Sequence, residues 1–209
     1  MLLFFVYHGS LAASQLRLIR ELNRAFLSSV KALLRVLDMR DPHTSAHSLK
    51  VQALAMEIAV ALHLPPERLE VVRYAALLHD IGKVGVPDEI LVGKGKLSVE
   101  HRQVMNRHAR HTKEILSQID FPTALADVPN VAAGHHERLD GSGPLGLAAA
   151  EIPLESRILA VADVFEALTA SRTYKELESM RETMNKLREM AGTHLDPVVI
   201  DALERALTL

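Results

Sequence analysis

The spacing of apolar residues constrains the fold of this chain more than any other feature. Between residues 14 and 37, leucine, isoleucine, valine and phenylalanine recur every three or four positions, the pattern of a long amphipathic helix. The same spacing returns in several later segments, and no segment shows the alternation typical of a half-buried strand. The pattern therefore predicts an all-α fold, a compact multi-helix bundle with an N-terminal helical extension.

Capping residues and helix breakers predict where the helices begin and end. A helix that begins near Pro66 runs into His79 and Asp80 before glycines break it. Ser98 caps the next helix, which carries His108 on its apolar stripe. Other expected boundaries are a helix from Asp41-Pro42 to Pro65, a loop over 84–97, a buried helix over 154–169, a helix end at Ala191-Gly192 and a start at Asp196-Pro197.

The length of the chain, 209 residues, predicts one domain with a substantial core and no second full domain. We expect residues 1–39 to form the helical extension or a linker and residues 40–209 to form the bundle. The extension is most simply a packing element, while a dimer formed through it as a coiled coil is an alternative. Residues 1–7 are apolar but much shorter than the roughly 20 residues of a membrane span, so no membrane insertion is expected.

Charge and cysteine content narrow the function classes. The chain has 24 Lys and Arg against 26 Asp and Glu, so no net field attracts DNA or RNA, and neither is expected as a partner. It has no cysteine, which excludes disulfides, thiolate metal ligands and cysteine nucleophiles, and fits a cytoplasmic location. Any metal site must therefore use histidine and carboxylate ligands.

The segment LLHDIGK, residues 77–83, predicts the centre of such a site. It ends an apolar helix with His79, Asp80 and then a helix-breaking glycine, which places two metal ligands at a helix end. Asp163 lies in the middle of an apolar helix, where a carboxylate costs several kcal/mol unless it is paired or binds metal. The full set of expected ligands is His47, His79, Asp80, His108, His135, His136 and Asp163.

Five imidazoles and two carboxylates are enough for two octahedral metals with one bridging carboxylate. Two ions about 3.5–4 Å apart can activate a bridging water and clamp the oxygens of a phosphate ester. The set therefore predicts metal-assisted hydrolysis of a phosphodiester or phosphomonoester. Lys83 and Arg172 would supply positive charge to a phosphoryl oxygen.

Each of these residues also has a structural interpretation. A single histidine is as often a hydrogen-bonded core residue as a ligand, and only the conjunction favours a site. Lys83 could cap its helix, and Arg172 could pair with Glu166 or Asp163. Glu137 and Asp140 could orient metal-bound histidines or only shape the loop that follows.

Four motifs together resemble one family. HDIGK at 79–83, HHERLDGSG at 135–143, EIPLESRILAVADVFEALTASRTYK at 151–175 and AGTHLDP at 191–197 are similar to the HD-GYP subgroup of HD-domain phosphohydrolases. The resemblance covers about residues 40–209. It implies an all-helical HD-domain bundle that hydrolyses cyclic di-GMP to pGpG or GMP at a carboxylate-bridged binuclear centre of iron or, next, manganese.

Carried over by position, the resemblance also implies roles for single residues. His47, His79, Asp80 and Asp163 would hold one metal, and Asp80, His108, His135 and His136 would hold the other, with Asp80 or Asp163 in the bridge. Asp80 and Lys83 would be catalytic, and Lys83 and Arg172 would contact phosphate.

Two departures from the family pattern leave alternatives open. The signature tyrosine should follow Ser142, but the chain reads Gly143-Pro144-Leu145-Gly146-Leu147, so the tyrosine is deleted. His43 stands where some members place a glutamate; it could hold a third metal, although two metals are expected. The alternatives to a cyclic di-GMP phosphodiesterase are a module that binds cyclic di-GMP or a signalling protein without turnover, and a hydrolase of another nucleotide.

Overall fold

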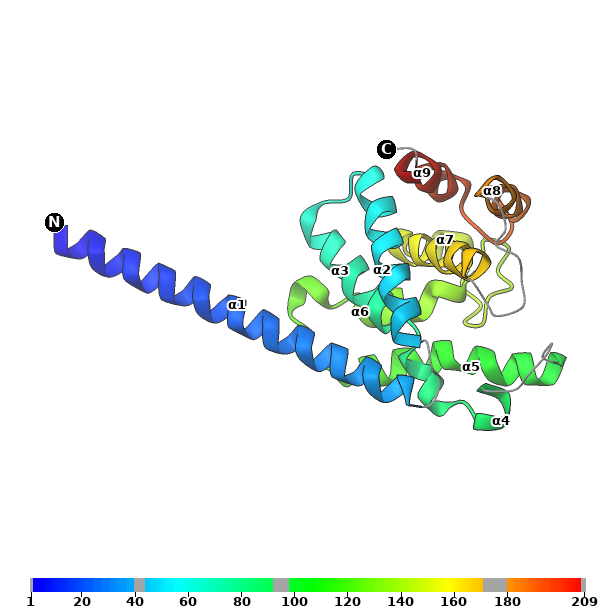
Figure 1. Cartoon of the computed structure of the whole chain (residues 1–209), viewed down its shortest axis with the longest axis horizontal. Coiled ribbons are helices and arrows are strands. Elements are labelled where there is room, and N and C mark those ends of the chain that lie inside the picture. The colour runs from blue at the N-terminus through cyan, green and yellow to red at the C-terminus, as the bar shows by residue number, and fades with distance from the viewer. Residues whose placement is uncertain (1, 40–43, 92–97, 171–179, 208–209) are drawn as a thin grey trace.

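The computed structural model describes residues 2–39, 44–91, 98–170 and 180–207. All regular elements in these ranges are helical, which confirms the predicted all-α bundle (Figure 1). The α-helices are α1 (Leu2–Asp38), α2 (Thr44–Ala61), α3 (Pro66–Leu78), α4 (Asp88–Leu91), α5 (Val99–Leu116), α6 (Val128–Ala133), α7 (Leu154–Thr169), α8 (Met180–Glu189) and α9 (Pro197–Leu207). Four short 3-10 segments accompany them: η1 (Ile81–Gly85), η2 (Thr123–Leu125), η3 (Gly134–His136) and η4 (Ala149–Glu151).

Helix α1 is longer than the apolar spacing predicts: it begins at Leu2, whereas the spacing predicts a start near residue 14. Its N-terminal part projects from the body of the protein, while its last turns lie against the bundle (Figure 1). Val30, Leu34 and Leu37 are buried there, and the Phe26 ring lies 5.2 Å from that of Tyr74. The C-terminal end of α1 is therefore part of the core.

Other apolar side chains of α1 are exposed. Leu18, Leu22, Leu33 and Val36 are between 42% and 61% exposed. A dimer through this helix and a domain boundary at residue 39 both remain predictions. No helix in the described part of the chain is long and apolar enough to cross a membrane.

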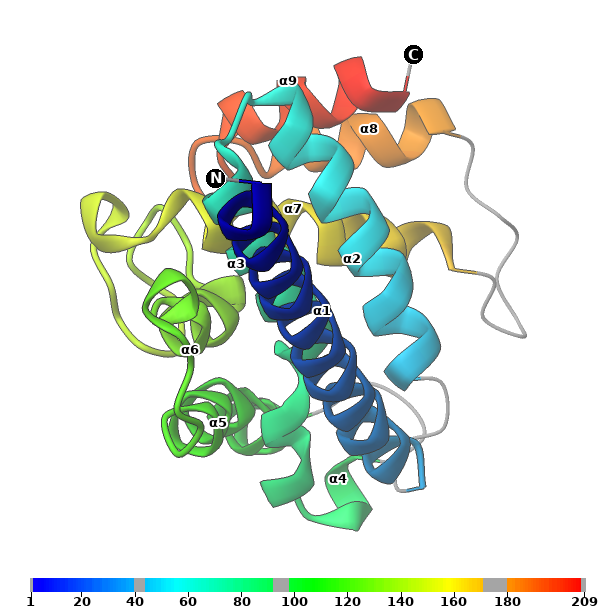
Figure 2. The ribbon, with the colours of Figure 1, turned by 90° about the vertical axis from the view of Figure 1, so that its left-hand side faces the viewer.

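Helix α2 is central to the bundle, since it packs against α3, α7 and α9 (Figure 2). Val51, Ala55 and Ile58 on its inner face are fully buried. The predicted start at Asp41-Pro42 lies outside the described residues. The first turn of α2 carries His47, so this packing fixes one of the expected ligands against α7.

The predicted loop over residues 84–97 is wrong for residues 88–91, which form the one-turn helix α4. Its formation has a local cause: the Pro87 carbonyl accepts the N–H groups of Ile90 and Leu91, both at 3.0 Å. Acidic residues Asp88 and Glu89 occupy this turn, where they suit the helix dipole. Ile90 is buried, so packing retains the turn.

Helix α2 ends at Ala61, four residues before the predicted stop at Pro65, and α8 ends at Glu189, just before the predicted Ala191-Gly192. The other predicted boundaries in the described residues agree with the structure. The Ser98 hydroxyl accepts the His101 N–H at 3.2 Å and caps α5. Gly192 has a φ of +77° after α8, a left-handed conformation that favours glycine. The Asp196 carboxylate accepts the Val198 N–H at 2.9 Å at the start of α9.

Candidate metal centre

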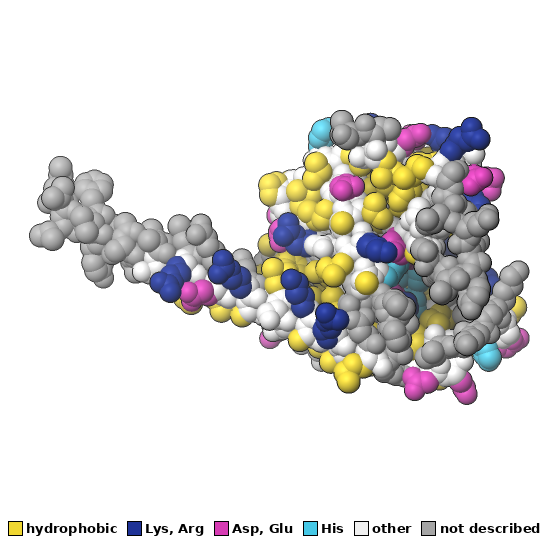
Figure 3. Space-filling view, viewed as in Figure 1, with side chains coloured by type: hydrophobic (Ala, Val, Ile, Leu, Met, Phe, Trp, Pro, Cys, Tyr) yellow, Lys and Arg dark blue, Asp and Glu magenta, His cyan; other side chains and the backbone are white. Residues whose placement is uncertain are grey.

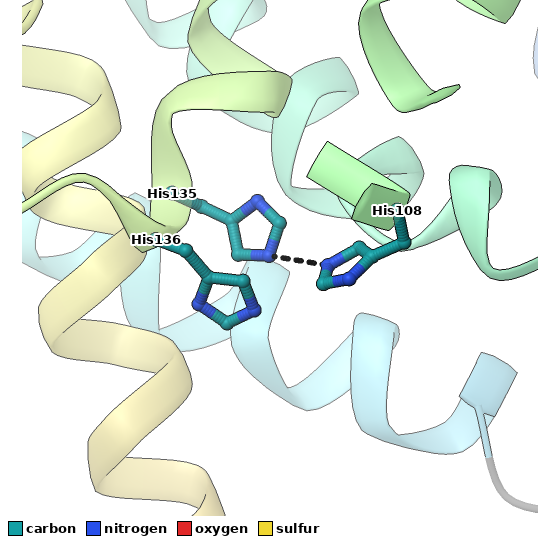
Figure 4. Close-up of side chains that lie close together, drawn as sticks. All are labelled: His108, His135 and His136. Carbon is teal, nitrogen blue, oxygen red and sulfur yellow. Dashed lines mark hydrogen bonds between the residues drawn. The ribbon is translucent and has the colours of Figure 1, made fainter. Parts of the chain in front are cut away.

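The structure brings all seven expected ligands together, although they come from five parts of the chain. Ligand atoms of His108, His135 and His136 lie within 4.8 Å of one another, and those of His47, His79 and Asp80 form a second such group. Figure 4 shows the first group, in which three imidazole rings converge from α5 and η3. The ligands stand on α2 (His47), the turn after α3 (His79, Asp80), α5 (His108), η3 (His135, His136) and α7 (Asp163).

The two groups adjoin each other through Asp80, which is only 2% exposed. Its Oδ2 lies 3.4 Å from His79 Nε2, while its Oδ1 lies 3.5 Å from His108 Nε2 and 4.0 Å from His135 Nε2. Each oxygen of one carboxylate therefore faces a different group. The Lys83 ammonium lies 2.7 Å from Oδ2 and adds a positive charge at the edge of the cluster.

Three of the histidines present a metal-binding nitrogen in a fixed orientation. The Nδ1 atoms of His79, His108 and His135 each lie 2.7 Å from the backbone carbonyl three residues earlier. A carbonyl can only accept, so Nδ1 carries the proton and Nε2 carries a lone pair. This is the tautomer that binds a metal through Nε2.

The Nε2 atoms fit a cation better than they fit one another. His79 Nε2 is buried without a hydrogen-bond partner. His108 Nε2 and His135 Nε2 lie 3.4 Å apart, and the dashed contact in Figure 4 therefore joins two acceptor nitrogens. Buried acceptors without donors are costly, and a divalent ion in each group would satisfy the Nε2 atoms of that group.

His47 is oriented differently, by carboxylates. Its Nε2 lies 3.0 Å from Asp163 Oδ1 and its Nδ1 lies 2.6 Å from Glu166 Oε2. The second oxygen of Glu166 accepts from Lys50 at 3.2 Å. Asp163 is thus paired, as its position on a buried helix predicted. The role of Glu166 was not predicted, although its three-residue spacing from Asp163 places both on one face of α7.

Burial and neighbouring charges move the pKa values of these groups in opposite directions. Burial lowers the pKa of His108 to about 4 and also lowers those of His135 and His136. Burial also lowers the pKa of His47, but its hydrogen bonds to Asp163 and Glu166 outweigh that effect and raise it to about 9. Burial disfavours the ionised form of Asp80, yet His79 and Lys83 hold its pKa well below the usual range.

The cluster reaches solvent on one side. The side chains of His47, Asp163 and Lys83 are 22%, 16% and 21% exposed, whereas His79, His108 and His135 are buried. Histidine side chains are visible in the middle of the body in the space-filling view (Figure 3). A substrate could therefore approach from this side while the deeper ligands stay dry.

Thr112 positions the HD turn and was missed as a functional residue. Its hydroxyl donates to the His79 carbonyl at 2.9 Å and accepts the Gly82 N–H at 3.0 Å. A Cβ on Gly82 would lie 2.0 Å from the His108 carbonyl oxygen, so η1 can approach α5 this closely only with glycine. The sequence placed Thr112 on the buried stripe of its helix, one turn after His108, but gave no sign of the hydrogen bonds.

Glu137 shapes the loop that lacks the signature tyrosine. It is 4% exposed, and its two oxygens accept the N–H groups of Leu145 and Leu147 at 2.7 and 2.8 Å. A Cβ on Gly143 would lie 2.5 Å from its Oε1. Asp140 acts in the same way on a smaller scale, since its Oδ1 accepts the Ser142 N–H at 2.9 Å. Of the two roles considered for these acids, loop shaping is the one observed.

Two expected site residues cannot be placed. Arg172, the second predicted phosphate contact, and His43, the position of a third metal, both lie outside the described residues. Both assignments remain predictions.

Comparison with known proteins identifies the family. The profile of the HD domain matches residues 31–199, most of the chain. The chain belongs to the HD-domain family. An HDG"Y"P protein of Bdellovibrio bacteriovorus has the same fold, with a TM-score of 0.64 and 21% identity over 79% of this chain and 52% of that chain.

Curated relatives agree with the resemblance to the HD-GYP subgroup. This HD-domain chain is 42% identical over 180 residues to the cyclic di-GMP phosphodiesterase response regulator RpfG of Xanthomonas campestris, covering 85% of this chain and 47% of that protein. It is 38% identical over 181 residues to 3'3'-cGAMP-specific phosphodiesterase 1 of Vibrio cholerae, covering 86% of this chain and 41% of that protein. The chain spans about half the length of the curated relatives it matches.

Proposed function

We propose that this chain is a metal-dependent phosphodiesterase that hydrolyses cyclic di-GMP. The observation that carries the proposal is the buried carboxylate of Asp80, which faces one histidine group with each of its oxygens. A bridging carboxylate between two nitrogen-rich groups suits two divalent ions. The names of the relatives supply the substrate, since RpfG is a cyclic di-GMP phosphodiesterase.

In this proposal His47, His79, Asp80 and Asp163 hold one ion, and Asp80, His108, His135 and His136 hold the other. Iron is the first expectation and manganese the second. When bound, two such ions polarise phosphoryl oxygens and lower the pKa of a water molecule. The histidines that donate Nδ1–H to backbone carbonyls would bind the ions through Nε2.

Other residues of the chain bind and orient the phosphate. The Lys83 ammonium lies beside Asp80 and is partly exposed, so it can contact a phosphoryl oxygen while it neutralises the cluster. Arg172 is proposed as a second phosphate contact. Burial of His79, His108 and His135 excludes water from the inner side of the site.

The proposal is tested with the chain purified, stripped of metal and reloaded anaerobically with Fe²⁺ or Mn²⁺. We expect cyclic di-GMP to be converted to pGpG or GMP, detected by chromatography, and Asp80→Asn to lower turnover by at least about 1,000-fold. Absence of product with either metal, when elemental analysis shows metal bound, would overturn it. Parallel reactions with 3'3'-cGAMP, dNTPs and ppGpp decide whether another nucleotide is the better substrate.

A module that binds cyclic di-GMP without turnover is the second candidate. The observation that favours it is the loop at Gly143, which lacks the tyrosine of the family and is closed down on the Glu137 carboxylate. Calorimetry on the metal-loaded chain distinguishes the two. Binding of cyclic di-GMP without product supports the second candidate, and binding with product supports the first.

A further inference from the structure

We propose that the two halves of the metal centre are unequal, and that Glu166 is the positioning residue that makes them so. The carboxylate subsite, formed by His47, His79, Asp80 and Asp163, takes a divalent ion first and holds it more tightly. The imidazole subsite, formed by His108, His135 and His136, fills second. This inference rests on the metal centre of the proposed function.

The first step is the distribution of negative charge. In the carboxylate subsite, Asp163 Oδ1 lies 3.0 Å from His47 Nε2 and Asp80 Oδ2 lies 3.4 Å from His79 Nε2, so two carboxylates accompany the two imidazoles. Among the described residues, the imidazole subsite has one carboxylate in contact, that of Asp80, whose Oδ1 lies 3.5 Å from His108 Nε2, while Asp163 acts on His136 only through space. A divalent cation is attracted more strongly to the subsite with more carboxylate charge, and burial increases the difference.

The second step is the hydrogen bond behind each histidine. His79, His108 and His135 donate Nδ1–H to neutral backbone carbonyls at 2.7 Å. His47 instead lies 2.6 Å from the Glu166 carboxylate, whose side chain is only 7% exposed. A charged acceptor gives a shorter and stronger bond and makes the opposite nitrogen a better electron donor to metal. Glu166 therefore strengthens the carboxylate subsite alone.

The third step is the way in which Glu166 is held. Lys50 lies on the same helix as His47 and donates to the second oxygen of Glu166 at 3.2 Å. His47 and Lys50 of α2 thus hold one carboxylate of α7 between them, which fixes the plane of the carboxylate and the ring that it faces. The Lys50 side chain is 64% exposed, so its own contribution is small and Glu166 is the residue to test.

Helix α7 offers a matched control for Glu166. Glu155 is also buried and paired, at 2.6 Å from Arg68 Nε, but it lies 11 positions away on the same helix, about 16 Å along its axis. Glu155→Gln and Glu166→Gln each remove one buried negative charge from α7. Only Glu166→Gln removes a carboxylate that contacts a candidate metal ligand, His47.

The experiment is a titration of the metal-free full chain with Co²⁺, followed by calorimetry and by the visible absorption of the bound ion. We expect two steps in the unmodified chain. Glu166→Gln should weaken the tighter step by about 10- to 100-fold and leave the weaker step unchanged. Glu155→Gln should leave both steps unchanged, and Glu166→Asp should restore part of the loss because the charge returns on a shorter side chain.

Ligand variants assign the steps to the subsites. His135→Gln should keep the tighter step, whereas His47→Gln should lose it, and this pair decides the order even where Glu166→Gln fails to fold. Three results would each overturn the proposed difference in affinity between the subsites while leaving the metal centre intact. They are two binding steps of equal affinity, equal weakening of both steps by Glu166→Gln, and loss of the tighter step in His135→Gln. Failure of the unmodified chain to bind any Co²⁺, Fe²⁺ or Mn²⁺ would overturn the metal centre itself and the inequality with it.

Discussion

The Thr112 hydroxyl donates a hydrogen bond of 2.9 Å to the backbone carbonyl of His79, across 33 positions of the chain. The same hydroxyl accepts the Gly82 N–H. Thr112→Val keeps the shape of the side chain but leaves a buried carbonyl and a buried amide without partners. We expect a loss of about 1–3 kcal/mol in the free energy of unfolding of the metal-free chain, measured with urea. Thr112→Ser keeps the hydroxyl and should lose less; equal losses in both variants would contradict this role.

Gly82 and Gly85 should respond very differently to alanine. A Cβ on Gly82 would lie 2.0 Å from the His108 carbonyl oxygen, part of the backbone of α5. On Gly85 it would meet the His111 side chain at 2.5 Å, which can rotate away. We expect Gly82→Ala to destabilise the chain by about 1–3 kcal/mol or more and to lower metal content. Gly85→Ala is the control and should do neither; thermal unfolding and elemental analysis measure both effects.

Binding of metal to the carboxylate subsite should release protons near neutral pH. His47 has a pKa of about 9 in the metal-free chain, so it is protonated at pH 7 and must lose its proton to become a ligand. Raising the pH favours the neutral ring, so affinity should rise by up to about tenfold per pH unit until pH 9. Calorimetry in two buffers with different ionisation enthalpies counts the protons.

Variants of two histidines check the origin of these protons. His47→Gln should lose this proton release together with the tighter binding step, because the protonated ring that supplies the proton is gone. His108 has a pKa of about 4 and is already neutral, so His108→Gln should not change the count between pH 6 and 8. Equal proton release in His47→Gln and the unmodified chain would contradict the assignment.

Glu137 should control the loop without controlling metal content. Its carboxylate accepts the N–H groups of Leu145 and Leu147, so Glu137→Ala leaves both amides without their acceptor. We expect hydrogen exchange of these two amides to accelerate by about tenfold or more, equivalent to at least about 1.4 kcal/mol, while metal content stays the same. Glu137→Gln retains one acceptor and should protect one amide. A loss of metal in Glu137→Ala would instead point to an effect on His135 and His136.

Much of this fold follows from local sequence patterns. The boundaries of α3, α5 and α7 depend on apolar spacing, on Pro66 and on the Ser98 cap, all of which act within a few residues. The convergence of the ligands was also predictable, because each stands at a helix end or on a buried stripe. By contrast, α4 is a single turn, and so short a helix has no periodic pattern to detect.

The supporting contacts of the site could not be predicted in the same way. His47 and Glu166 are 119 positions apart, and they meet only because of how α2 packs on α7. The sequence suggested Arg172 as a partner for Glu166 or Asp163, and nothing in it indicated that His47 would contact both. Thr112 is similar, since a threonine on an apolar stripe also fits a packing role. Pairing between distant elements depends on helix packing, which local patterns do not specify.

Two of the candidate ligands also complete the helices that they follow. The last four carbonyls of an α-helix have no partner within the helix. Helix α3 ends at Leu78 and α6 ends at Ala133, and the carbonyls of Ala76 and Ala132 in their last turns accept from the rings of His79 and His135. Replacing either histidine would remove a hydrogen bond from a helix end even in a chain that never binds metal. Selection for folding alone would therefore tend to preserve both histidines, and their presence in a descendant that had lost all activity would be expected.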